Sequence, residues 1–73
     1  MQENPLEQAL RHLREGKERV ARQEALVAEL LTDGQDTKNA EELLSELEKL
    51  VALARRHLMA EEDQARQHSG STS

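Results

Sequence analysis

Two runs of apolar residues with seven-residue spacing, separated by the polar segment 33–36, constrain the fold of this chain most strongly. The first run consists of Leu6, Leu13, Val20 and Val27. The second contains three neighbouring rows: Ala40, Leu47 and Ala54; Leu43, Leu50 and His57; Leu44, Val51 and Leu58. Seven residues make about two helical turns, so each row lies on one face of a helix rather than alternating as in a strand. The pattern predicts two amphipathic helices and no sheet.

The residues at the ends of the two runs are those that start and stop helices. Asn4 is a good N-cap before Pro5, and Glu7 follows three positions later, as in a capping box. Gly34 can adopt the left-handed conformation that closes a helix. A second helix then starts with Thr37 as its cap, or alternatively Asp36.

These signals place one helical hairpin in residues 1–64, with a helix at 5–32, a turn at 33–36 and a helix at 37–64. After Asp63 the apolar pattern stops, and the Ser- and Gly-rich end predicts a disordered tail over 65–73. Because the turn is short, the second helix must fold back antiparallel to the first. Val20 then lies opposite Leu47, and Leu13 lies opposite Ala54.

The second helix carries more apolar surface than one helical contact can cover, and Leu53 and Ala60 widen it further. The chain has 73 residues, no cysteine and no aromatic residue, so a single hairpin builds only a small core. We therefore expect an all-α, coiled-coil-like hairpin that dimerises into a four-helix bundle, with a hairpin from another protein as the alternative. The expected interface residues are Leu13, Val20, Val27, Leu43, Leu47, Leu50, Val51, Ala54 and Leu58.

Gly16 and Gln23 interrupt the apolar face of the first helix. An interior glycine costs about 1 kcal/mol relative to alanine, so Gly16 is either a tolerated weak point or a place where another backbone approaches closely. Gln23 is either a buried polar residue that sets the register or a residue at the edge of the contact.

Charge is distributed unevenly along the chain, whose net charge is −5. Residues 11–22 hold five basic and two acidic side chains, whereas 24–48 hold one basic and eight acidic side chains. The candidate nucleic-acid contacts are Arg11, Arg14, Lys17, Arg55 and Arg56. Glu7–Arg11, Glu15–Arg19 and Glu18–Arg22 are spaced for helical ion pairs, which would neutralise much of this positive charge. Together with the overall acidity, this spacing argues against nucleic-acid binding.

The histidines suggest a site near the open end of the hairpin, where His12 and His57 lie at similar levels, each with a glutamate one turn later. The paired Glu-x-x-His and His-Glu-x-x-His motifs of metal sites are absent, so we expect no metal or other cofactor. The hypothesis for His57 is a partly buried residue of the helix contact that makes dimer stability depend on pH between about 5 and 8. Ser45 lies far from any histidine and no cysteine is present, so we expect no enzyme.

One stretch resembles a known group of proteins. Arg22-Gln23, Leu30, the segment 33–37, the segment 40–44 and a leucine-rich helix ending near His57 are similar to small uncharacterised bacterial helical-hairpin proteins. The resemblance covers about half of the chain and implies the hairpin fold. It implies no activity.

The sequence thus indicates a non-enzymatic protein-interaction module that forms a homodimer and binds another protein through the apolar face of the second helix. One alternative is an RNA-binding regulator similar in size and form to the Rop-like plasmid copy-number regulators. Another is a small acidic antitoxin or inhibitor that places the turn end in a basic cleft. No signal peptide is evident in residues 1–5, and no apolar stretch approaches the roughly 20 residues of a membrane span, so we expect a cytoplasmic protein without membrane contact.

Overall fold

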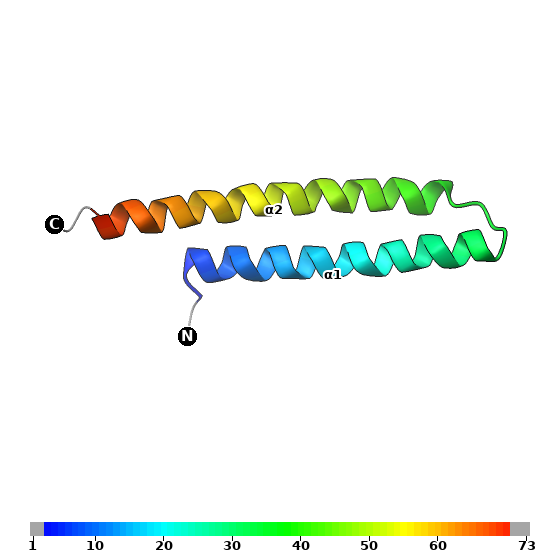
Figure 1. Ribbon diagram of the computed structural model, residues 1–73, viewed down its shortest axis with the longest axis horizontal. Coiled ribbons are helices and arrows are strands. Elements are labelled where there is room, and N and C mark those ends of the chain that lie inside the picture. Colours follow the sequence, from blue (N-terminus) through cyan, green and yellow to red (C-terminus); the bar gives the residue numbers. More distant parts are fainter. Residues whose placement is uncertain (1–2, 71–73) are drawn as a thin grey trace.

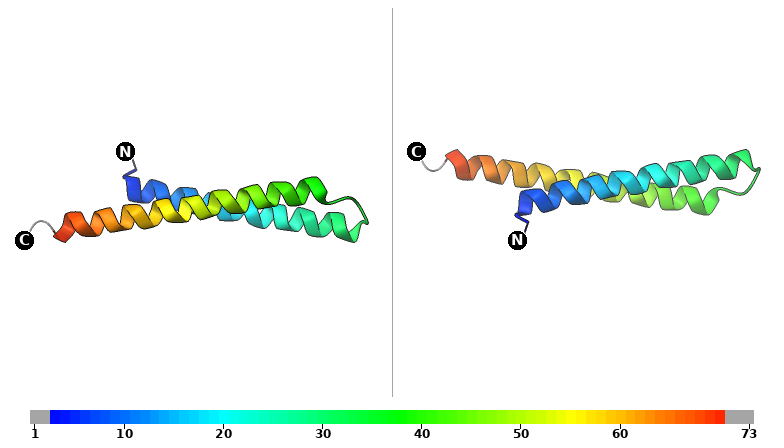
Figure 2. Two further views of the ribbon diagram at one scale, coloured as in Figure 1. Left: turned by 90° about the horizontal axis from the view of Figure 1, so that it is seen from above. Right: turned by 90° about the horizontal axis from the view of Figure 1, so that it is seen from below.

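The chain forms two long helices that lie side by side and run in opposite directions (Figure 1). The computed structural model describes residues 3–70. Helix α1 spans Pro5–Thr32 and has 28 residues, and helix α2 spans Lys38–Gly70 and has 33 residues. The helices cross at a shallow angle when viewed from above or below (Figure 2). The all-α helical hairpin predicted from the apolar rows is confirmed.

Helix α1 has the bounds that its capping residues predict, but α2 continues well beyond position 64. Residues 65–70, which we expected to lie in a disordered tail, are helical, and 71–73 lie outside the described residues. The expectation was wrong because apolar periodicity reports which face is buried and not how far helical backbone hydrogen bonds continue. Ala65, Arg66 and Gln67 all favour helix, and Arg66 pairs with Asp63 at 3.3 Å.

The first turn of α1 is held by its predicted cap. The Asn4 side-chain oxygen accepts a hydrogen bond from the Glu7 backbone N–H at 2.7 Å, and the Asn4 side-chain amide donates to the Glu7 carboxylate at 3.3 Å. Pro5 occupies the start of the helix, where its missing N–H removes no helical hydrogen bond. The start of α1 is therefore fixed by residues close in sequence.

The end of α1 closes in a Schellman motif. Gly34 has φ 71°, and its N–H donates to the Leu31 carbonyl at 3.1 Å, while the Gln35 N–H donates to the Leu30 carbonyl at 2.9 Å. Two residues together cap the start of helix α2. The Thr37 carbonyl accepts the first helical hydrogen bond, and the Asp36 carboxylate accepts from the Lys38 N–H at 3.0 Å. The two capping candidates thus share the role.

The two helices meet along a contact that we call the seam. In α1 the seam contains Leu6, Ala9, Leu13, Gly16, Val20, Gln23, Val27 and Leu30. In α2 it contains Thr37, Ala40, Leu44, Leu47, Val51, Ala54, Leu58 and Glu61. Both sets alternate steps of three and four residues, which is the spacing of coiled-coil contact positions. Of the side chains described, all those not exposed belong to the seam, except Arg11 and Glu15.

The seam buries little apolar surface. Ala9 and Leu13 are the buried apolar residues of the described chain, and Gln23, further along α1, is its buried polar residue. The Cα radius of gyration is 17.2 Å, against about 11 Å expected for a compact domain of this length. A hairpin of this shape keeps one side of each helix open, so most apolar side chains remain in contact with solvent.

Candidate interaction surface

A second row of side chains runs along α2 next to the seam, and we call it the outer stripe. It consists of Leu43, Glu46, Leu50, Leu53, His57 and Ala60. Each member immediately precedes a seam residue, so the outer stripe is rotated from the seam by about 100° around α2. Leu43, Leu50 and Leu53 are 50%, 56% and 57% exposed. The outer stripe is thus a mainly apolar line, interrupted by Glu46 and His57, with the same spacing as the seam but without a covering element.

The structure divides the predicted interface residues between these two surfaces. Seven of them lie in the seam, where the chain's own helices contact each other: Leu13, Val20, Val27, Leu47, Val51, Ala54 and Leu58. Leu43 and Leu50 lie in the outer stripe and face solvent. A partner that docks beside α2 therefore meets Leu43 and Leu50 directly, together with Leu53.

One exposed leucine of α1, Leu26, escaped the sequence analysis. Leu26 of α1 is 42% exposed, and it precedes the seam residue Val27 just as outer-stripe residues precede theirs. That one-residue offset was the signal available in the sequence. Leu10, Leu31 and Met59 are also at least half exposed, but they belong to neither row.

Gly16 and Gln23 fix how the two helices meet. A Cβ atom placed on Gly16 would lie 3.1 Å from Cγ2 of Val51, so the missing side chain permits a close approach of the helices. The Gln23 side-chain amide donates to the backbone carbonyl of Ala40 at 2.9 Å across the seam. Of the two interpretations left open for each residue, these contacts favour close approach for Gly16 and a buried register-setting role for Gln23.

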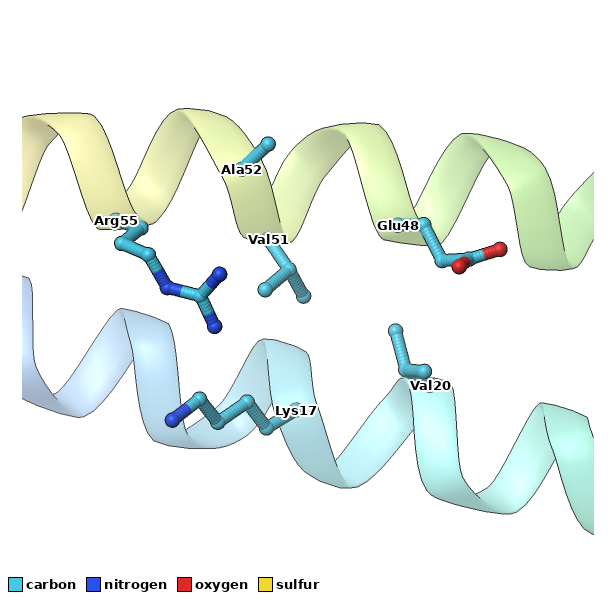
Figure 3. A pocket seen from close by; sticks show the side chains of 6 residues that line it. All are labelled: Lys17, Val20, Glu48, Val51, Ala52 and Arg55. Carbon is cyan, nitrogen blue, oxygen red and sulfur yellow. The ribbon is translucent and has the colours of Figure 1, made fainter.

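The opposite side of the seam is charged. Lys17 of α1 and Glu48 and Arg55 of α2 line a shallow hollow there, around the seam residues Val20 and Val51. Figure 3 shows Arg55 extending from α2 toward α1, on the same side of Val51 as Lys17. We call Lys17, Glu48 and Arg55 the charged flank. Two of the five candidate nucleic-acid residues are therefore brought together from separate helices.

The other three candidate cations lie elsewhere or are already paired. Arg14 lines a groove on α1 together with Lys17, and Arg56 lines one on α2 beside Leu53. Arg11 pairs with Glu3 at 2.9 Å and with Glu15 at 3.4 Å, and these carboxylates raise the pKa of its guanidinium. Lys17 thus shares grooves with both Arg14 and Arg55, whereas Arg56 lines a separate groove and Arg11 is paired with carboxylates.

The ion pairs themselves differ from those predicted from spacing. Within residues 3–67, whose side chains are described, Glu7–Arg11, Glu15–Arg19 and Glu18–Arg22 do not reach the 4.0 Å distance of a salt bridge. Arg11 instead reaches back past the helix start to Glu3, which spacing within a helix cannot reveal. Exposed arginine side chains have many rotamers of similar free energy, so i,i+4 spacing alone does not select one partner.

The histidines occupy less enclosed positions than expected. His57 is a member of the outer stripe and not of the seam; its side chain is 56% exposed, with Nε2 3.9 Å from a Glu61 carboxylate oxygen. His12 borders a groove with Glu15, Arg19 and Leu50. No group of three metal-ligating residues occurs in the part of the chain that the structure describes. The His57 side chain is therefore free to meet a partner, and its proposed burial in the hairpin is wrong.

Over residues 3–70, neither helix combines the length and the apolar character required to cross a membrane. No protein-family model, curated protein or solved structure matches the chain. The resemblance to bacterial helical-hairpin proteins thus stays a prediction, and any function must be argued from the seam, the outer stripe and the charged flank.

Proposed function

We propose that this chain is a non-enzymatic protein-interaction module that self-associates in the cytoplasm, two hairpins forming a four-helix bundle. The observation that carries the proposal is the outer stripe, in which three leucines at least half exposed follow one line along α2. Isolated exposed leucines are common on protein surfaces, but several exposed leucines aligned on one helix face are typical of an interaction site. Leu43, Leu50 and Leu53 form the centre of the proposed contact.

The direction of the outer stripe supports a bundle rather than a larger flat assembly. In a four-helix bundle each helix contacts two neighbours placed roughly at right angles around it. The seam and the outer stripe are about 100° apart around α2, close to this requirement. The seam provides one neighbour, α1, and the outer stripe provides a place for a second.

The accessible area supports the same proposal. The hairpin exposes 5965 Å², whereas a compact chain of this size exposes roughly 4,600 Å². A stable protein–protein interface buries about 800 Å² on each partner. The surplus exposed area is therefore large enough for a complete interface of ordinary size.

A second candidate, binding to RNA phosphates, is favoured by Lys17 and Arg55 on the charged flank. Glu48 lines the same hollow, and Arg11 is already paired with Glu3, so the positive charge is partly neutralised. Phosphate binding would weaken steeply with salt. Affinity for RNA that does not change with salt concentration would rule this candidate out.

Sedimentation equilibrium tests the leading proposal directly. We expect a concentration-dependent dimer between about 1 µM and about 1 mM protein. Leu50→Asp, in the outer stripe, should be monomeric over this range, whereas Leu31→Asp, at a leucine 61% exposed outside the stripe, should associate like the unmodified chain. A monomeric unmodified chain, or equal effects of both substitutions, would overturn the proposal.

A further inference from the structure

We propose that the second copy docks its own α2 antiparallel on the outer stripe, with Leu50 of each copy facing Leu53 of the other. This inference rests on the proposed self-association and adds the surface, the direction and the register of the contact. The two-fold axis would pass close to Val51 and Ala52, midway along the stripe.

The order of residues in the outer stripe is what selects this arrangement. From one end the stripe reads Leu43, Glu46, Leu50, Leu53, His57 and Ala60. When a second α2 runs in the opposite direction, Leu50 meets Leu53, Leu43 meets Ala60, and Glu46 meets His57. A two-fold interface joins the same patch on both copies, so the patch must complement itself when reversed. The outer stripe complements itself in this way, because the side chains that face each other match in size and in polarity.

The polar members of the stripe are placed to take part. The Glu46 side chain is 67% exposed. Its carboxylate oxygen lies 3.4 Å from Nζ of Lys49, in an exposed i,i+3 pair. The His57 side chain is 56% exposed and lies 3.9 Å from Glu61. Neither side chain is enclosed by its own hairpin, so each remains available to a carboxylate or imidazole from the other copy.

Other arrangements of the same surface place unfavourable groups together. A parallel pairing of the two α2 helices sets Glu46 against Glu46, so that two carboxylates oppose each other within the contact. An antiparallel pairing displaced by one heptad toward the turn sets Glu46 against Leu50 and buries a carboxylate without a partner, and the opposite displacement sets the polar His57 against Leu53. The proposed register avoids both and places four leucines together at the middle of the dimer.

The self-complementary order also argues for a second copy rather than a different protein as the occupant. A foreign helix needs only a matching row of its own and puts no requirement on how the outer stripe reads when reversed. In the reversed stripe, the large Leu43 faces the small Ala60, and the acidic Glu46 faces the basic His57. Both matches arise within a single sequence.

Disulfide trapping tests the direction and register, since the chain contains no cysteine of its own. Leu43→Cys protein is mixed with Ala60→Cys protein and oxidised, and the products are separated by mass. We expect the mixed disulfide to predominate. Positions 43 and 60 are about 25 Å apart along the helix, so in the antiparallel dimer Leu43→Cys alone cannot meet its own copy within the roughly 7 Å that a disulfide allows.

A matched control uses Ser45→Cys, an exposed position on α2 outside the outer stripe, which should give no mixed disulfide with Ala60→Cys. A disulfide between two Leu43→Cys chains would show a parallel dimer and overturn the inference. Absence of the mixed disulfide in a sample that sediments as a dimer would show that another face is used. A monomeric unmodified chain would instead defeat the proposed function itself, so the two failures are distinguishable.

A charge exchange provides an independent readout. His57→Glu should weaken the dimer by about three- to tenfold, because it sets two pairs of carboxylates against each other, and Glu46→Lys should weaken it by removing the carboxylate that faces His57. The double variant re-forms both opposite-charge contacts and should regain most of the affinity. Additive weakening in the double variant would contradict the pairing of Glu46 with His57.

Discussion

The seam and the outer stripe follow the same three-and-four spacing along α2, yet they differ in what they contain. The seam includes several small residues, among them Ala9, Gly16, Ala40 and Ala54, which let the helices lie close together. The outer stripe contains three leucines that the hairpin leaves at least half exposed. The geometry of the hairpin is therefore set in one place, while much of its apolar surface lies in the other.

This difference indicates how folding and assembly are coupled. Covering the exposed part of each outer-stripe leucine contributes about 1 kcal/mol, and a symmetric dimer covers six. Isolated helices are marginal in water, and a seam with two buried apolar residues adds little to their stability. We therefore expect the hairpin to gain most of its stability when a second copy is present.

The largest expected effect comes from Leu50→Asp in the outer stripe. The substitution removes two central leucines from the dimer and introduces two carboxylates, so the dissociation constant should rise about 1,000-fold. Helicity measured by circular dichroism should fall by more than half at concentrations where the unmodified chain is folded. Leu31→Asp should keep its helicity, and full helicity in Leu50→Asp would contradict the coupling of folding to assembly.

A smaller effect is expected in the seam from Gln23→Ala. This change removes the hydrogen bond to the Ala40 carbonyl and part of a buried side chain, and should cost about 1–2 kcal/mol per chain. In contrast to Leu50→Asp, it should shift the thermal midpoint at every protein concentration without abolishing its concentration dependence. Gln8→Ala, at an exposed glutamine of α1, is the matched control and should shift the midpoint little.

Substitutions at Gly34 test whether the backbone geometry of the turn also contributes to the stability of the hairpin. Gly34→Ala forces a Cβ atom into the left-handed region at φ 71° and should cost about 1 kcal/mol in chemical denaturation, although no neighbouring atom lies within 4 Å. Gly34→Asn should cost less, because asparagine adopts this conformation more readily. Equal stability of the alanine and glycine chains would show that the turn opens without loss of the fold.

The smallest effect is expected from Gly16→Ala in the seam. Alanine gains about 1 kcal/mol in helix propensity, but its Cβ atom would lie 3.1 Å from Val51, so the net gain should stay below about 0.5 kcal/mol. In a Val51→Ala chain the same substitution should gain nearly the full amount, as measured by a double-mutant cycle. Destabilisation in both backgrounds would mean that the close approach is not what limits this position.

Features that depend on neighbouring residues were predicted well from the sequence. The cap at Asn4, the left-handed Gly34 and the start of both helices follow from local hydrogen bonding and backbone sterics. Even the pairing of Leu13 with Ala54 followed from a short turn and matching apolar rows, and it agrees with the observed contact of Gly16 with Val51.

The division between the seam and the outer stripe could not be predicted in this way. Leu43 and Leu44 are adjacent in sequence and equally apolar, and only the rotation of α2 against α1 decides which of them faces inward. For the same reason His57 was predicted to lie in the contact that Leu58 occupies. The end of α2 was also missed, because the residues after Glu61 carry no apolar row from which the length of the helix could be predicted.

The one-residue offset between the seam and the outer stripe restricts how the length of this chain can change during evolution. A single inserted residue just before Leu43 would rotate the rest of α2 by about 100° and bring Glu46 and His57 against α1. Insertions or deletions of seven residues, made in both helices at facing levels, would leave every contact in phase. Descendants of this hairpin should therefore differ in length by whole pairs of heptads and seldom by one residue.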